Sequence, residues 1–190
     1  MISEAVDLER LLWRFQKKMN KRWIRKIILF VVILLLVRLI SCFLMQHTTV
    51  HGESMQPTLQ DGDCLLMDKI SYRFRDPKRF DIVVFSYRYK ENTYYIKRVI
   101  GLPGDTIKIS KGVIYVNGKA LVEHYGNDAI QEAGLAAGEI VLGDDEYFVL
   151  GDNRNSSIDS REPSVGNIKK ENIVGRVWMC LTFGERFGVL

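Results

Sequence analysis

Cysteine is scarce in this 190-residue chain. Its three cysteines are Cys42, Cys64 and Cys180, and no two have the C-x-x-C spacing of a zinc or redox site. This excludes the disulfide framework that holds many small secreted domains together. Two states remain open for Cys64 and Cys180: buried free thiols, or one disulfide in an extracytoplasmic domain. We expect no metal and no other cofactor.

Histidine is equally scarce, which limits the candidates for a catalytic base. The chain has His47, His51 and His124, but no G-x-S-x-G and no S-x-x-K motif. His51 stands only three residues before Ser54 in a segment that we expect to be extended. That spacing is unfavourable for removing the hydroxyl proton, so the sequence does not favour a Ser-His-Asp triad.

Positive charge is absent from a long central stretch, with no lysine or arginine between Arg38 and Lys69. Residues 1–26 contain eight lysines and arginines against three acidic residues, a net charge of +5. Because the whole chain carries +4 and Arg38 adds one, residues 39–190 sum to −2. A nucleic-acid-binding domain would need a basic folded surface, so we expect no nucleic-acid partner.

One long apolar run covers residues 27–45, where only Arg38 and Ser41 are clearly polar. Its 19 residues are close to the ~20 needed to cross a bilayer. A central arginine costs about 3 kcal/mol on insertion scales, but the many Leu, Ile, Val and Phe residues return about 0.3–0.6 kcal/mol each. The run therefore predicts a single transmembrane helix, with its basic N-terminal flank in the cytoplasm.

Residues 1–26 form a separate cytoplasmic segment in this prediction. Apolar residues recur there at helical spacing among basic ones, which indicates an amphipathic helix on the inner membrane surface; they are Leu8, Leu11, Leu12 and Phe15. A cleaved secretory signal would have a shorter basic region and a small-x-small site after the apolar core. Leu39 to Cys42 resembles a lipoprotein cleavage box, but Arg38 directly before it indicates a chance match.

Residues 46–190 have the pattern of a mainly β domain. Short apolar or alternating runs are separated by turn residues, at 64–67, 82–85, 94–100, 106–109, 113–116, 140–142, 147–150 and 173–181. Asn117-Gly118 between two such runs is the strongest hairpin signal. Residues 128–137 are a weak candidate for a helical insertion, because Gly134 interrupts them.

Ser54 and Lys97 are the residues most able to carry chemistry. Lys97 lies within the apolar run at 94–100, where burial would favour its neutral amine. An unperturbed lysine, with a pKa of about 10.4, must fall towards about 7–8 to act as a base. A neutral Lys97 within hydrogen-bond reach of Ser54 would make a serine–lysine dyad.

The chain resembles bacterial type I signal peptidases from about Val50 to Trp178. The resemblance rests on an ordered set of segments at Gly52–Leu59, Gly62–Leu65, Tyr95–Asp105, Gly151–Arg154 and Ser157–Arg161, behind an N-terminal anchor. It implies an all-β catalytic domain with a signal-peptidase-like (LexA-like) fold. Relatives in the endoplasmic reticulum have histidine at the base position, so Lys97 indicates the bacterial type.

The resemblance also implies roles for individual residues. Ser54 would be the nucleophile, Lys97 the general base, and Ser157 would hydrogen-bond the lysine amine. Asp152, Asp159 and Arg161 would hold their loop by ion pairing, and Arg98 would join them. The Ser54 backbone N–H would stabilise the oxyanion. Some members supply a second donor from a serine two residues before the nucleophile, where this chain has Gly52.

A membrane-bound serine endopeptidase that removes signal peptides from exported preproteins is the implied function. Cleavage would follow small residues, in shallow pockets formed by Val50, Met55, Leu59, Tyr95 and Ile96. The implied partners are those signal peptides, the lipid bilayer and a neighbouring secretion translocon. Ser54 is nine residues beyond Met45, at most ~30 Å when extended, so the active site would lie near the outer membrane face.

Two other functions fit parts of this pattern. A self-cleaving serine–lysine repressor has a similar β core, but would need a DNA-binding module and a cleavable linker in place of the anchor. An anchored β domain could instead bind exported proteins without cutting them, and would then not depend on Ser54.

Overall fold

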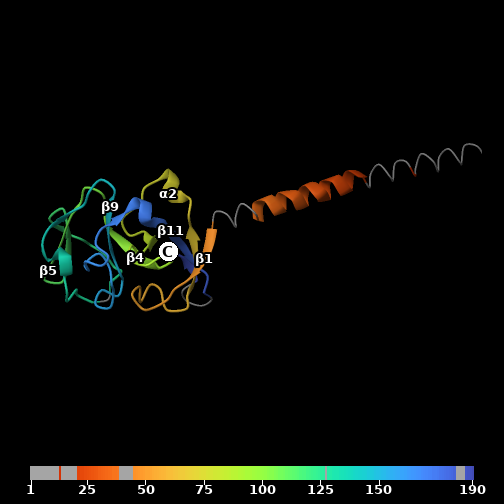
Figure 1. Cartoon of the computed structure of the whole chain (residues 1–190). Coiled ribbons are helices and arrows are strands. Elements are labelled where there is room, and N and C mark those ends of the chain that lie inside the picture. Colours follow the sequence, from red (N-terminus) through yellow and green to blue (C-terminus); the bar gives the residue numbers. More distant parts are fainter. Residues whose placement is uncertain (1–12, 14–20, 39–44, 127, 183–186) are drawn as a thin grey trace, which may run out of the picture. The chain divides into compact units, whose positions relative to one another are not determined.

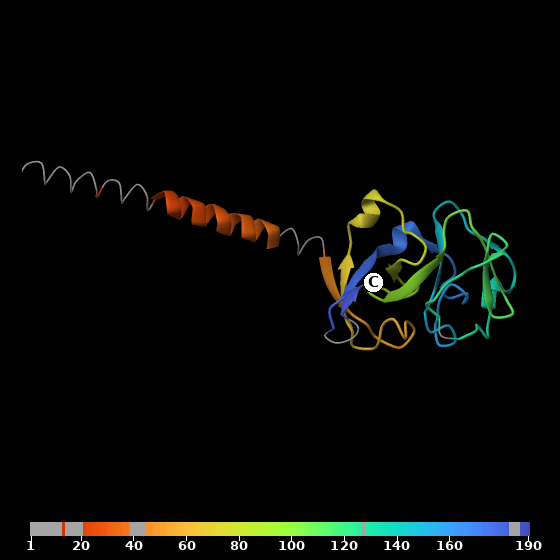
Figure 2. The same cartoon turned by 180° about the vertical axis from the view of Figure 1, so that it is seen from behind.

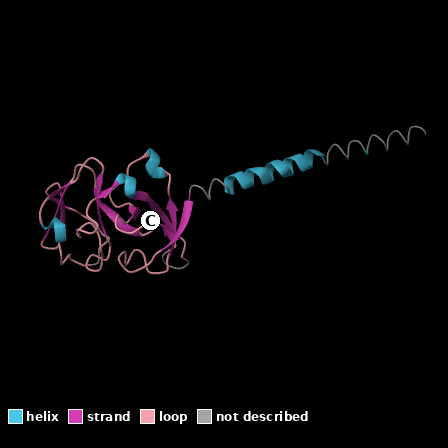
Figure 3. Cartoon of the chain, viewed as in Figure 1, coloured by secondary structure: helices cyan, strands magenta, loops and turns pink. Residues whose placement is uncertain are grey.

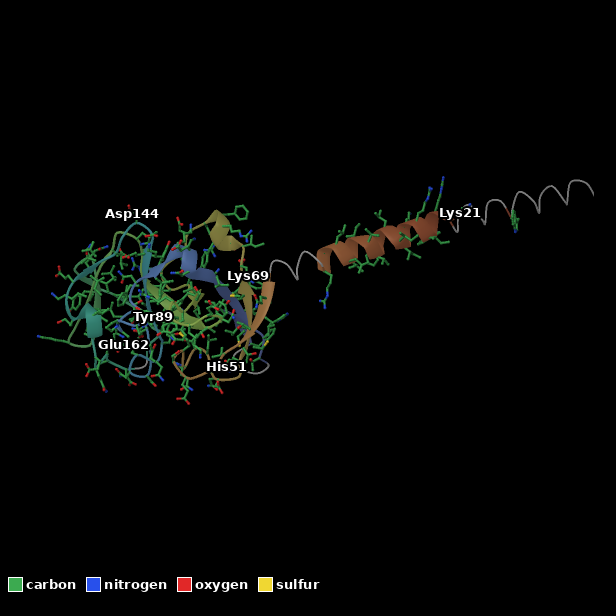
Figure 4. The ribbon with its side chains drawn as sticks, in the orientation of Figure 1. Lys21, His51, Lys69, Tyr89, Asp144 and Glu162 are labelled. Atoms are coloured by element: carbon green, nitrogen blue, oxygen red, sulfur yellow. The ribbon has the colours of Figure 1, made fainter. Side chains whose placement is uncertain are left out.

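A computed structural model describes residues 13, 21–38, 45–126, 128–182 and 187–190. The chain divides into two compact units, Met1–Phe43 and Leu44–Leu190. In the first unit, residues 21–38 form a helix, whose side chains include Lys21 (Figure 4). The described residues include no helix with both the length and the apolar character of a membrane span.

Several predictions for the N-terminal part lie outside the described residues. These are most of the amphipathic segment before residue 21 and the Leu39–Cys42 box. At the far end of the predicted span, Met45 is the first residue of strand β1 (Met45–Thr49). The prediction that the apolar helix extends through Met45 was therefore wrong at this residue, because its backbone pairs with Asp68 of the next strand.

The second unit is mainly β, as predicted (Figures 1 and 3). Within the described residues, its larger sheet has eight strands in the order β1-β2-β11-β3-β4-β9-β10, with β12 paired to β11. These strands, after β1, are β2 (Cys64–Asp68), β3 (Ile82–Ser86), β4 (Tyr94–Gly101), β9 (Glu146–Leu150), β10 (Ile168–Lys169), β11 (Ile173–Cys180) and β12 (Gly188–Val189).

A second, four-stranded sheet has the order β7-β6-β5-β8 within the described residues. Figure 2 shows it at the end of the unit away from β1. Its strands are β5 (Thr106–Ser110), β6 (Val113–Val116), β7 (Lys119–Ala120) and β8 (Ile140–Val141). The predicted Asn117-Gly118 hairpin joins β6 to β7, and both turn residues have positive φ angles, of 52° and 76°.

Helical structure in this unit is limited to short pieces among the described residues. They are α2 (Ser71–Phe74) and the 3-10 turns η1 (Gly134–Ala137) and η2 (Lys170–Asn172). The weak helical prediction for residues 128–137 is therefore confirmed only as the single turn η1. Gly134, with a φ angle of 54°, starts that turn, and an added Cβ there would lie 2.4 Å from the Arg161 carbonyl oxygen.

The strand register decides whether Cys64 and Cys180 are free thiols or form a disulfide. Cys180 of β11 is paired with Leu65 of β2, the residue after Cys64. Since successive side chains in a strand point to opposite faces, Cys64 and Cys180 project to opposite faces of the sheet. Both thiols are free, Cys180 fully buried and Cys64 half-buried. The disulfide alternative was therefore wrong.

Three apolar clusters make the core of this unit. One includes residues of the turn that follows β1, one includes residues of the neighbouring strands β3, β4 and β9, and one includes residues of the smaller sheet. The first cluster includes Val50, Met55 and Leu59, which come from the segment that contains Ser54. Ser54 is thereby attached to the sheet by buried neighbours on both sides in sequence.

Candidate active site

Ser54 lies in a compact turn between β1 and β2. Leu59 N–H donates to the Met55 carbonyl at 2.9 Å, which closes the turn after Ser54. Met55 and Leu59 are 1% and 0% exposed, so their side chains hold this turn against the core. The half-buried Ser54 is left at the edge of a groove, where its hydroxyl is accessible.

Lys97 reaches Ser54 from the middle of β4. Its backbone is paired with Val83 of β3, and the residue is only 4% exposed. Lys97 Nζ lies 2.7 Å from Ser54 Oγ and donates to the Ile96 carbonyl at 3.0 Å. Lys97, the expected base, is therefore within hydrogen-bond distance of the Ser54 hydroxyl. The two residues are 43 positions apart in the sequence.

Burial changes the proton affinity of this amine. It lowers the pKa of Lys97 from 10.5 to about 8, because the charged form loses its hydration, while the carboxylates of Asp159 and Asp152 oppose the change. A substantial fraction of the amine is consequently neutral near physiological pH. The neutral form has the lone pair that a general base needs.

Asp152 pairs with Arg98, the neighbour of Lys97 on β4. Arg98 Nε and Nη2 donate to the two oxygens of Asp152 at 2.8 and 2.7 Å, and both side chains are almost completely buried. The Thr58 hydroxyl also donates to Asp152, at 2.6 Å. One carboxylate thus joins β4, the Ser54 turn and the loop at 151–161.

Asp159 pairs with Arg161 within the 151–161 loop. Arg161 Nε and Nη2 each lie 2.9 Å from an Asp159 oxygen, and Asp159 also accepts the Gly151 N–H at 3.1 Å. All three residues are buried. The ion pairs expected for Asp152, Asp159, Arg161 and Arg98 are thus all present.

Ser157 differs from its expected arrangement. Its Oγ is buried and has no hydrogen-bond partner among the described residues, so the bond to the Lys97 amine that the resemblance implied is not formed here. The hydroxyl is instead packed tightly against Gly151, where an added Cβ would lie 2.2 Å from Ser157 Oγ and 2.4 Å from the Ser54 carbonyl oxygen. Only a glycine at position 151 leaves room for both the Ser157 side chain and the Ser54 carbonyl group at these distances.

A groove with a volume of about 980 Å³ runs past Ser54 and Lys97. Four of the five residues expected to form substrate pockets line it, namely Val50, Met55, Tyr95 and Ile96. The fifth, Leu59, does not: it is completely buried in the core cluster below, so its assignment to the pocket was wrong. Its contribution to the site is to support the turn.

Other groove residues were not found from the sequence. Val84 of β3 and the exposed Ile158 line it, together with Thr93 and the remaining groove residues His47, Thr48, Thr49, His51, Gly52, Glu53, Asn92, Tyr94 and Ser156. His51 is exposed on the segment after β1 (Figure 4). Short apolar or alternating runs predicted the strands β3 and β4, but not which face would border a groove.

The arrangement can perform nucleophilic chemistry from a serine and a lysine. Histidines line the groove, but the described contact of Ser54 Oγ is with the Lys97 amine. No group of three or more His, Cys, Asp or Glu side chains that could hold a metal ion occurs in the described part of the chain. The groups that can move a proton at Ser54 are therefore its own hydroxyl and Lys97.

The amino-acid sequence of this chain is similar to those of known proteins. A family model described as signal peptidase, peptidase S26, matches residues 21–182. A probable signal peptidase I-2 of Synechocystis sp. is 41% identical over 156 residues, which cover 80% of this chain and 69% of that protein. Signal peptidase I P of Bacillus subtilis subsp. natto is 40% identical over 173 residues, 85% of this chain and 91% of the relative.

A solved structure is also similar. It is the crystal structure of a signal peptidase I from Enterococcus faecalis V583, with 30% sequence identity over 54% of this chain and 97% of that one, and a TM-score of 0.43. The family model and the curated relatives confirm the predicted resemblance and make the chain a peptidase. It belongs to the signal peptidase family, peptidase S26.

Proposed function

We propose that this chain is a membrane-bound serine endopeptidase that removes N-terminal signal peptides from exported preproteins, with Ser54 as nucleophile and Lys97 as general base. The observation that carries the proposal is the 2.7 Å distance between Lys97 Nζ and Ser54 Oγ, with the lysine buried. Burial supplies a neutral amine, and the turn presents the hydroxyl to the groove. Both are needed for attack on a peptide carbonyl.

In the first step, neutral Lys97 takes the proton of the Ser54 hydroxyl while Oγ attacks the carbonyl carbon of the scissile peptide bond. The resulting Lys97 ammonium then gives its proton to the leaving amine, which departs as the new N-terminus of the mature protein. The signal peptide remains as an ester on Ser54 Oγ. Lys97, neutral again, takes a proton from water while the water oxygen attacks the ester carbonyl carbon. The bond to Ser54 Oγ breaks, the signal peptide leaves with a free carboxyl group, and Lys97 returns the proton to Oγ.

The negative charge that develops on the carbonyl oxygen needs hydrogen-bond donors. The Ser54 backbone N–H is the donor we assign, and loss of such a donor costs several kcal/mol of barrier in other serine peptidases. Gly52 has no side chain to offer a second one, and its N–H already donates to Asp61 at 2.8 Å. The second donor must therefore come from another group at the groove.

Specificity for small residues before the cut follows from the walls of the groove. Its floor near Ser54 is made by the apolar side chains of Val50, Met55, Val84 and Ile96, with Tyr95 beside them. Val50, Met55 and Val84 are buried, which leaves little depth for a bulky substrate side chain. A signal peptide has small residues at the first and third positions before its cleavage site.

The anchor proposal rests on the apolar run that begins at residue 27 and ends before β1, and on its basic flank. Residues 1–26 would stay in the cytoplasm, the run would cross the bilayer once, and residues 46–190 would be extracytoplasmic. This orientation brings the groove close to the outer lipid surface, where a signal peptide held by the secretion translocon would present its cleavage site. Signal peptides, lipids and a nearby translocon are the partners that this proposal names.

The test is cleavage of a preprotein by the purified full-length chain in detergent. We expect Ser54→Ala and Lys97→Ala each to lower kcat by a factor of about 10³ or more, since both members of such a unit are needed. A preprotein with a bulky residue directly before the cut should be a poor substrate for the unmodified chain. Normal processing by either alanine variant would contradict the dyad, and equal cleavage of both preproteins would contradict the pocket.

A further inference from the structure

The segment after β7 lies against the 151–161 loop and contacts it repeatedly. We refer to residues 121–126 and 128–135 as the strap. Asn155 accepts the Gln131 N–H at 3.0 Å and donates to the Ala129 carbonyl at 3.1 Å. Arg161 Nη1 donates to the Glu132 carbonyl at 3.0 Å. These backbone contacts keep the strap in one register along the loop.

Glu123 of the strap makes a largely buried ion pair with Arg154 of the loop. Both carboxylate oxygens of Glu123 accept from the Arg154 guanidinium, the second at 2.8 Å from Nη2. The Arg154 side chain is 2% exposed and that of Glu123 is 15% exposed. A two-point pair at this depth fixes the plane of the guanidinium as well as its charge.

The same guanidinium holds the start of the loop. Arg154 Nε donates to the Gly151 carbonyl at 3.0 Å, while Nη1 and Nη2 donate to Glu123. Gly151 is in turn packed against the backbone of Ser54, and Asn153 N–H donates to the Ser54 carbonyl at 3.0 Å. A continuous set of contacts therefore runs from Glu123 through Arg154 and Gly151 to the backbone of the nucleophile.

Tyr125 of the strap gives a second, independent path. The Arg98 guanidinium lies over its ring, with the central carbon 3.6 Å from the ring centroid. Arg98 is the residue after Lys97 on β4, and the Nε–Nη2 edge of its guanidinium donates to Asp152. Tyr125 thus covers the ion pair that stands next to the base, and helps exclude water from it.

We propose that the strap is a positioning element for the Ser54–Lys97 pair, with Glu123 and Tyr125 as its positioning residues. The proposal deepens the proposed function and rests on it. Neither side chain lines the groove at Ser54, so both act through other residues. Weakening the strap lets the 151–161 loop relax, which misplaces Ser54 and admits water to Lys97.

The test compares Glu123→Gln with the wild-type chain, using the full-length protein in detergent and a preprotein substrate. Glu139→Gln is the matched control, since Glu139 makes an exposed ion pair with Lys108 in the smaller sheet. We expect Glu123→Gln to lower kcat by roughly tenfold or more with little change in KM, because small displacements of catalytic groups are costly. The activity of Glu123→Gln should also rise at a higher pH than that of the wild-type chain, because water near Lys97 favours the charged amine and raises its pKa.

Two further measurements separate positioning from a general loss of stability. Tyr125→Ala should reproduce the lower kcat and the shifted pH profile, while Tyr125→Phe, which keeps the ring, should lose less. Hydrogen exchange in the catalytically inactive Ser54→Ala background should show faster exchange at 151–161 when Glu123→Gln is added. That readout does not depend on activity, so it stands even if Ser54 proves not to be the nucleophile.

The proposal is overturned if Glu123→Gln and Tyr125→Ala keep normal kcat, pH profile and loop exchange. It is also overturned if activity falls only as far as thermal stability does, with the pH profile unmoved, because a purely structural role predicts that result. Normal cleavage by Ser54→Ala would instead refute the proposed function. The two failures are therefore distinguishable.

Discussion

Burial of Lys97 on β4 lowers the pKa of its amine towards the range in which a lysine can act as a base. Its charged form is disfavoured by the loss of water, and the two nearby aspartates only partly offset that loss. Both aspartates are themselves paired with arginines, Asp152 with Arg98 and Asp159 with Arg161. The ion pairs thus limit how strongly the carboxylates can hold the ammonium form.

The first prediction at this scale concerns pH. Because only the neutral amine can take the proton of Ser54, kcat/KM should rise with pH through an apparent pKa of about 8. Below that value it should fall by about tenfold per pH unit. The profile is measured with the full-length chain and a preprotein, from mildly acidic to alkaline pH. Activity that is flat down to acid pH would rule out a lysine base.

The second prediction concerns stability. The pKa of Lys97 is lowered on folding from 10.5 to about 8, so at neutral pH the folded state is less favourable than it would be with an apolar side chain. Replacing the amine by Lys97→Met should abolish cleavage and raise the free energy of unfolding at pH 7 by up to about 3 kcal/mol.

The sign of this effect gives it a pH window. The unfavourable contribution is complete below about pH 8 and disappears as pH rises from about 8 to 10.5, where the amine is neutral in both states. Denaturant unfolding in detergent should therefore show a gain for Lys97→Met that shrinks at alkaline pH. The exposed Lys119→Met is the control. A Lys97→Met variant less stable than the wild-type chain would contradict the argument.

At the scale of elements, the 151–161 loop and the Ser54 turn depend on each other. The Thr58 hydroxyl donates to Asp152, and Asn153 N–H donates to the Ser54 carbonyl. The close approach at Gly151 completes this contact. Ser54 is therefore positioned by a loop about 100 residues later in the chain.

The third prediction tests that approach. Gly151→Ala would place a methyl group 2.4 Å from the Ser54 carbonyl oxygen, so turn and loop must separate. We expect a loss of kcat of about 10²-fold, the size expected for a displacement near 1 Å. Gly138→Ala is the control, because its added Cβ meets no atom within 4 Å. Equal activity of the two variants would show that the close approach is not needed.

The sequence predicted most strands of the catalytic unit, because each has a short apolar run between turn residues. It did not predict β1, whose Gln46-His47-Thr48-Thr49 has no apolar alternation and which pairs only at the sheet edge with β2. Asn117-Gly118 was predicted correctly because its backbone needs positive φ angles that few residues adopt.

Only part of the candidate active site could be predicted from the sequence, because some of its contacts leave no local pattern. Ser54, Lys97 and the ion-paired loop stand in recognisable segments, and the structure brings them together. Leu59 was assigned to the pocket because its segment matches a motif, but a single chain position does not reveal whether a side chain faces a groove or the core. Contacts such as Glu123 with Arg154 join distant segments without a local pattern.

At the scale of the whole molecule, the proposed function requires that the N-terminal apolar run hold the β unit at a membrane. The fourth prediction is that the chain stays with membranes after an alkaline carbonate wash. In intact spheroplasts, protease added outside should degrade residues 46–190 and leave an epitope tag at the N-terminus intact, because basic flanks stay in the cytoplasm. A catalytic unit that is protected until the cells are lysed would contradict this orientation.

Identifying the group that carries the acyl intermediate tests the serine–lysine mechanism directly. Acid quenching during turnover of a preprotein, followed by proteolysis and mass spectrometry of the chain, locates the ester. We expect the signal-peptide fragment on Ser54 Oγ, and no such adduct in Lys97→Ala. An adduct on another residue, or rapid cleavage by Lys97→Ala through the same ester, would contradict it.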